Sequence, residues 1–96
     1  MLTDDFDLAL FVVADVTEVD AKDILSSCKK MEFVEARVLL YQVMKDMGYH
    51  PAQIATKVGK SKQGVLLLLE DFDLRIKSSP IFSRMYKEIS NKLATN

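Results

Sequence analysis

The glycines and prolines of this chain separate segments whose apolar residues recur at helical spacing. Gly48 and Gly59 each follow such a segment, where a left-handed residue commonly ends a helix. Pro51 and Pro80 each stand where the first turn of a new helix is expected. No repeat, low-complexity stretch or flexible linker interrupts the sequence. Length and segmentation together predict one all-α domain over residues 1–96, a compact bundle of about five or six helices.

The apolar periodicity and the capping residues indicate where these helices lie. Ser61 is a good N-cap for the second of two closely spaced helices. Asp20 is expected to be the N-cap of a short helix earlier in the chain. The β-branched residues of the first segment also leave a strand possible there. The inner faces are expected to include Phe11 and Ile81. The predicted segments are 6–16, 20–25, 32–47, 51–58, 62–76 and 80–93.

The composition predicts a hydrophobic core, and it predicts neither a membrane-spanning helix nor an internal disulfide. Hydrophobic residues make up 49% of the chain, enough for a core at this size. The longest unbroken apolar runs, 9–14 and 65–69, are far shorter than the roughly 20 residues that a membrane helix needs. Cys28 is the only cysteine, and the first residues are acidic rather than a basic segment before an apolar block. We therefore expect a cytoplasmic protein that does not enter a membrane.

Catalytic and metal-binding motifs are not apparent in the sequence. His50 and Cys28 are the only histidine and cysteine, too few for a zinc site, and no histidine lies near Cys28 in sequence to activate it as a nucleophile. Gly48, Gly59 and Gly64 are too scattered for a phosphate-binding loop. We expect no enzymatic activity, no metal and no cofactor.

Acidic and basic residues are segregated along the chain. Residues 1–23 contain seven acids and one lysine, whereas residues 24–96 contain twelve basic and seven acidic residues. The formal net charge of the whole chain is only −1. Because local potential governs the encounter with a polyanion more than net charge does, a basic face is compatible with this balance. Helix capping and solubility are the alternative role for the N-terminal acids.

The segment 53–68 matches the spacing of a helix-turn-helix motif. Ala55 is small where two helices cross closely, Gly59 lies four residues later in the turn, and Val65 follows after six more, where it can pack between the helices. Ser61 can cap the second helix and offer its backbone N–H and hydroxyl to a phosphate. The same spacing also occurs in helical hairpins that bind no DNA, so the motif alone leaves both interpretations open.

A wider set of residues shares its order and spacing with a known family. The set comprises Val12-Val13-Ala14, Asp23-Ile24-Leu25-Ser26, Ala36-Arg37, Tyr41, Ile54, Gly59, Val65, Phe82 and Leu93. From about residue 6 onward the chain resembles the C-terminal DNA-binding domain of the bacterial replication initiator DnaA, a helical domain with a Trp-repressor-like helix-turn-helix. The resemblance implies a protein that binds double-stranded DNA, with the helix from Lys62 in the major groove and a role in replication control or transcription regulation.

The resemblance also indicates which residues would contact DNA. Lys60 stands where the family has arginine, Ser61 where it has a capping aspartate, and Lys62 and Gln63 where it has histidine and threonine. Lysine lacks the planar fork that reads guanine, whereas Gln63 can pair with the N6 and N7 edge of adenine. The family's basic loop aligns with Ser27–Lys30. Arg37, at the start of the long helix, is expected to contact a phosphate. The candidate DNA contacts are Lys29, Lys30, Arg37, Lys57, Lys60, Ser61, Lys62 and Gln63.

Two leucines support a function of a different class. If Val65 and Leu68 face inward, Leu66 and Leu67 project partly outward, where a groove-reading helix normally presents polar side chains. These leucines would be removed from water if the N-terminal helix, the last helix or a second copy of the chain covered them. Contact with a thymine methyl group is a further possibility. The alternative function is a protein-interaction or homodimerisation module on the same fold, without DNA binding.

Overall fold

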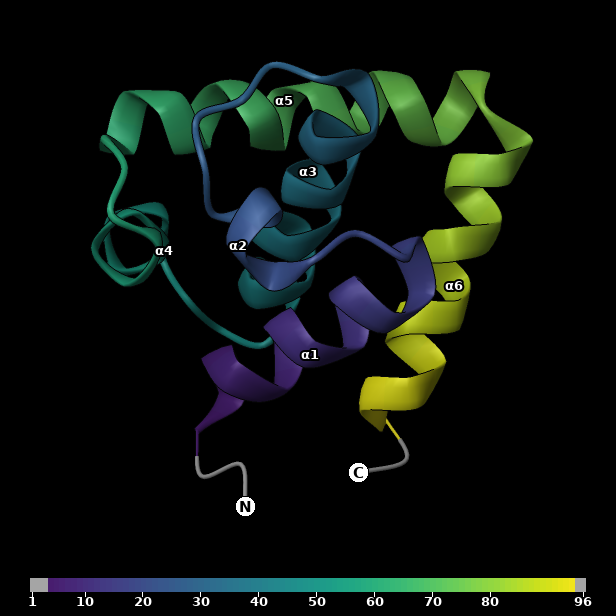
Figure 1. Cartoon of the computed structure of the whole chain (residues 1–96), viewed down its shortest axis with the longest axis horizontal. Coiled ribbons are helices and arrows are strands. Elements are labelled where there is room, and N and C mark those ends of the chain that lie inside the picture. The colour runs from purple at the N-terminus through teal and green to yellow at the C-terminus, as the bar shows by residue number, and fades with distance from the viewer. Residues whose placement is uncertain (1–3, 95–96) are drawn as a thin grey trace.

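The computed structural model describes residues 4–94, which form six α-helices and no strand (Figure 1). The predicted all-α bundle is therefore confirmed, and the strand considered for the first segment is a helix. The elements are α1 (Asp5–Thr17), α2 (Ala21–Ile24), α3 (Met31–Asp46), α4 (Pro51–Val58), α5 (Lys62–Ser78) and α6 (Pro80–Ala94).

Helix α3 is the centre of the bundle and packs against each of the other five helices. Its residues from Ala36 to Tyr41 are all buried, because neighbours surround this part of the helix on every side. Figure 1 shows α5 lying across one side of α3, α6 descending from the end of α5, and α1 closing the opposite side. The pair α4 and α5 therefore forms one edge of the molecule, away from most of α1.

Side-chain caps begin α1 and α5, whereas Asp20, the cap expected for α2, makes no side-chain cap hydrogen bond. The Oδ1 atom of Asp4 accepts a hydrogen bond from the backbone N–H of Asp7 at 2.9 Å, at the start of α1. The Oγ atom of Ser61 accepts one from the backbone N–H of Gly64 at 3.0 Å, at the start of α5. Each cap satisfies one of the N–H groups that a helix leaves unpaired at its first turn.

Two glycines end helices in the left-handed region, as their positions in the sequence predict. Gly48 has φ +104° after α3, and Gly59 has φ +70° after α4. A Cβ atom at either position would meet no heavy atom within 4 Å. The requirement for glycine is therefore conformational rather than steric.

Two residues expected on inner faces lie at the surface. Phe11 and Ile81 are both exposed. The buried face of α1 is set by Ala9, Val12 and Val13, and Phe11 lies on the opposite side of that helix. Ile81 belongs to the first turn of α6, at the corner with α5, where no other helix covers it. Both residues were expected to be buried because they are apolar and belong to helices. Each lies on a part of its helix that no other helix covers, and it is therefore exposed.

Candidate nucleic-acid interface

Helices α4 and α5 pack through the small and branched residues that the spacing predicts. Ile54, Ala55 and Val58 of α4 are buried, and Val65 of α5 is completely buried. Figure 1 shows α4 almost end-on beneath the beginning of α5, so the two helix axes are steeply inclined to each other. The left-handed Gly59 makes the short turn between them possible.

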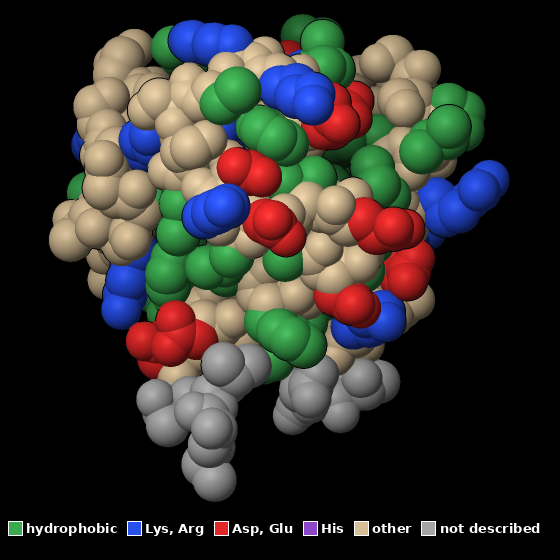
Figure 2. Space-filling model, viewed as in Figure 1, with side chains coloured by type: hydrophobic (Ala, Val, Ile, Leu, Met, Phe, Trp, Pro, Cys, Tyr) green, Lys and Arg blue, Asp and Glu red, His purple; other side chains and the backbone are tan. Residues whose placement is uncertain are grey.

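The first turn of α5 is open to solvent. Ser61, Lys62 and Gln63 are all exposed. No acidic side chain lies in this turn, and the partial positive charge of a helix N-terminus is therefore not neutralised within it. Figure 2 shows many of the visible acidic side chains over the region of α1 and α2 instead. Within residues 4–94 the first turn of α5 is therefore accessible, and Asp4 is paired with Lys57 at the end of α4.

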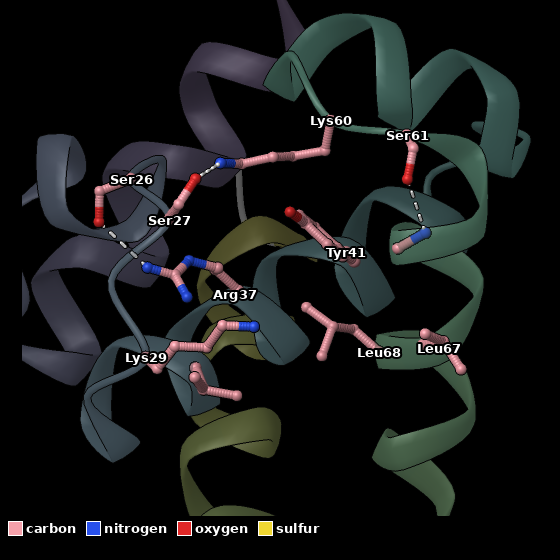
Figure 3. Close-up of a pocket in the computed structure, with 11 residues that line it drawn as sticks. Ser26, Ser27, Lys29, Arg37, Tyr41, Lys60, Ser61, Leu67 and Leu68 are labelled. Carbon is pink, nitrogen blue, oxygen red and sulfur yellow. Dashed lines mark hydrogen bonds between the residues drawn. The ribbon is translucent and has the colours of Figure 1, made fainter.

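Three of the candidate lysines lie near the start of α5, whereas Lys30 does not, because the sulfur of the next residue, Met31, lies 3.8 Å from Arg75 late in α5. Lys57 is at the end of α4 and Lys60 in the turn, while Lys29 and Lys30 come from the loop between α2 and α3. The Nζ atom of Lys60 donates a hydrogen bond to the Oγ atom of Ser27 at 2.7 Å, which joins the turn to that loop (Figure 3). The fold therefore brings Ser27 of this loop beside the turn before α5.

Two of these lysines already have partners within the chain. Lys57 forms an exposed ion pair with Asp4, with 3.8 Å between Nζ and Oδ2. The Nζ atom of Lys30 lies 5.5 Å from the centre of the Phe33 ring. Both are surface contacts of the weak kind that an external phosphate can replace.

Arg37 is buried, and two of its three guanidinium nitrogens are bonded within the chain, so it does not lie at the surface, where a contact with a DNA phosphate was expected. Its side chain is only 6% exposed. Nε donates to the carbonyl oxygen of Ile24 at 2.7 Å, and Nη2 donates to the carbonyl of Asp23 at 3.0 Å and to Oγ of Ser26 at 3.1 Å. These carbonyls belong to the last turn of α2, where a cation is favourable. Arg37 therefore fixes α2 on α3.

The two leucines expected to project outward differ from each other. Leu67 is 57% exposed, whereas Leu66 is half-buried. Leu74, two helical turns after Leu67 on the same side of α5, is 69% exposed. The exposed apolar pair is thus Leu67 and Leu74 rather than Leu66 and Leu67.

A cavity of about 380 Å³ lies beside the start of α5, and no pattern in the sequence indicated it. It lies between the α2–α3 loop, α3 and α5 (Figure 3). The hydroxyl of Tyr41 is at its wall, and burial raises the pKa of this hydroxyl above its usual value, while the charge of Arg37 opposes the shift. In the sequence Tyr41 stands among the apolar residues of a predicted helix. Helical periodicity gives no information on where its hydroxyl points, so the cavity could not be predicted from it.

A second tyrosine with a raised pKa lies away from this region. Burial and a hydrogen bond to the carboxylate of Asp46 raise the pKa of Tyr86 to about 12. Its ring packs edge-on against Phe72, with 4.8 Å between the ring centres. Tyr86 therefore joins α6 to α5 and to the end of α3, and it belongs to the core packing.

Comparisons with family models and with curated proteins found no match to this chain. The structure defines it as a small all-α protein. No helix within residues 4–94 combines the length and apolar character needed to cross a membrane. The same residues contain no group of three or more histidine, cysteine, aspartate or glutamate side chains placed to hold a metal ion.

Proposed function

We propose that this chain binds double-stranded DNA through the exposed beginning of α5, with α4 and α5 acting as a helix-turn-helix. The observation that carries the proposal is the open first turn of α5, with Ser61, Lys62 and Gln63 exposed and no acid beside them. An unobstructed helix N-terminus with neighbouring lysines attracts phosphates and fits the width of the major groove.

The contacts divide into two kinds under this proposal. Lys29, Lys30, Lys57 and Lys60 meet backbone phosphates on either side of α5, and Lys62 and Gln63 meet base edges. Phosphate contacts position a protein on the duplex, whereas base contacts select the sequence. The hydrogen bond from Lys60 to Ser27 holds the basic loop and the turn at a fixed spacing. This spacing supports phosphate contacts from both segments.

We further propose that the chain is a freestanding relative of the DNA-binding domain of DnaA, acting in replication control or transcription regulation. The support is the resemblance in order and spacing, together with the burial of Ile54 and Val65 between α4 and α5. Arg37 departs from the role that the resemblance implies, because it is buried and its Nε and Nη2 atoms bond the end of α2.

The proposal is tested by titrating a short fluorescent duplex of mixed sequence and following its anisotropy. Binding is expected at about 50 mM salt and strong weakening at about 200 mM, because each lysine–phosphate contact contributes about 0.9 to the slope of log K against log salt. An anisotropy that stays flat at the lower salt concentration would contradict the proposal.

A protein-interaction module remains the second candidate function, favoured by the exposure of Leu67 and Leu74. Both lie on one side of α5, and two copies of the chain can bury them by packing these sides together. This function does not require the lysines around the start of α5.

The dimer prediction can be checked by sizing chromatography with light scattering. The Leu67→Lys/Leu74→Lys double variant is expected to elute as a monomer under conditions in which the unmodified chain elutes as a dimer, because two charges would enter an apolar contact. A Lys87→Glu variant, altered at an exposed position of α6, is the control and should leave the dimer intact. A monomeric unmodified chain at all concentrations would exclude this function.

A further inference from the structure

The cavity beside α5 has one polar side and one apolar side. Ser26, Ser27, Lys29 and Lys60 approach from the α2–α3 loop and from the turn before α5. The side chains of Val34, Leu67 and Leu68 form the apolar part of the wall. At about 380 Å³ the cavity has the volume of a small-ligand site.

A hydroxyl that makes no hydrogen bond within residues 4–94 opens onto this space. Tyr41 is only 3% exposed, and its hydroxyl has no hydrogen-bond partner among residues 4–94. In Figure 3 the hydroxyl points into the space framed by Arg37, Lys60 and Ser61. No buried side-chain polar atom among the described residues lacks a partner, so this hydroxyl is not sealed in the core but is accessible from the cavity. It is therefore available to donate a hydrogen bond to a polar group of a ligand there.

The remaining polar groups determine the charge of that ligand. The Nη1 atom of the buried Arg37 donates to no atom of the described residues, although Nε and Nη2 are both engaged. Lys29 and Lys60 carry two further positive charges on the same lining, and no aspartate or glutamate contributes to it. Donors and cations without an opposing carboxylate select an anionic group.

We propose that this cavity binds a small amphipathic anion, a molecule with one carboxylate or phosphate group joined to an apolar part about the size of a benzene ring. The anionic group meets Tyr41, Lys60 and the free nitrogen of Arg37. The apolar part lies against Val34, Leu67 and Leu68. A phosphate of a DNA strand would leave the apolar wall unused, which favours a separate small molecule. The site does not depend on DNA binding.

The test uses phenyl phosphate and benzoate as probes and follows the backbone amide signals of the full chain by NMR, without DNA. Saturable shifts are expected at Ser27, Gly64 and Leu68, which surround the cavity. Benzyl alcohol lacks the charge and inorganic phosphate lacks the ring, so each should bind about tenfold more weakly than phenyl phosphate or not at all. Shifts that do not saturate, or equal affinity for inorganic phosphate, would overturn the proposal.

Two variants of the cavity and one control variant show whether the probes bind in the cavity or elsewhere on the surface. Tyr41→Phe removes only the hydroxyl and is expected to weaken phenyl phosphate binding about fivefold, the size of one hydrogen bond. Tyr49→Phe makes the same change at a tyrosine outside the cavity and is expected to have no effect. Val34→Phe fills the apolar side and should abolish binding while the amide spectrum remains that of a folded protein. Unchanged affinity in both Tyr41→Phe and Val34→Phe would contradict the assignment.

Discussion

Replacing Arg37 by methionine is expected to lower the free energy of unfolding by about 3 kcal/mol, the largest effect anticipated for a single change in this chain. The variant keeps a long apolar side chain but loses three hydrogen bonds, two of them to the carbonyls of Ile24 and Asp23. Those carbonyls would then lack their charged donor at the end of α2. For a domain of this size the melting temperature should fall by about 15 °C.

The matched control is Arg84→Met, which makes the same substitution at an exposed position of α6. Its effect should stay within about 0.5 kcal/mol, as for most surface substitutions. Thermal unfolding followed by circular dichroism measures both variants. Equal melting temperatures for the two variants would show that the buried guanidinium of Arg37 does not hold α2 in place.

The second large effect is expected on DNA affinity. The Lys60→Ala/Lys62→Ala double variant should bind a duplex about tenfold more weakly at low salt, since two charged contacts are lost. The slope of log K against log salt should also decrease by about 1.8. Lys60 additionally loses its hydrogen bond to Ser27, which loosens the α2–α3 loop. Fluorescence anisotropy with the same duplex measures the affinity and the slope.

The control for this pair is Lys77→Ala/Lys87→Ala, which removes two exposed lysines from the end of α5 and from α6. The net charge changes by the same amount in both double variants, so a general electrostatic effect would weaken them equally. The proposed interface predicts that the control retains nearly all of its affinity. An equal loss in both variants would place the contact elsewhere.

The helices of this protein were predictable because their limits depend on local chemistry. Ser61 caps α5, and Gly48 and Gly59 end α3 and α4 in the left-handed region, as their positions in the sequence indicate. Such signals involve residues only a few positions apart, and they need no knowledge of tertiary contacts.

The role of Arg37 could not be predicted in the same way. Its partners in α2 and just after it lie 11 to 14 residues earlier in the sequence, and only the packing of α2 on α3 brings them together. The cavity beside Tyr41 depends on tertiary structure for the same reason, because three separate segments enclose it. The exposure of Leu67, in contrast, was expected from helical periodicity once Val65 was placed inside.

Amide chemical shifts measured during titration with a duplex identify the surface that meets DNA, which we propose to be the open beginning of α5. The largest shifts are expected on residues 60–65 and on the loop residues 27–30, with little change along α6. Shifts concentrated on α1 or α6, or spread evenly over the whole molecule, would contradict this proposal.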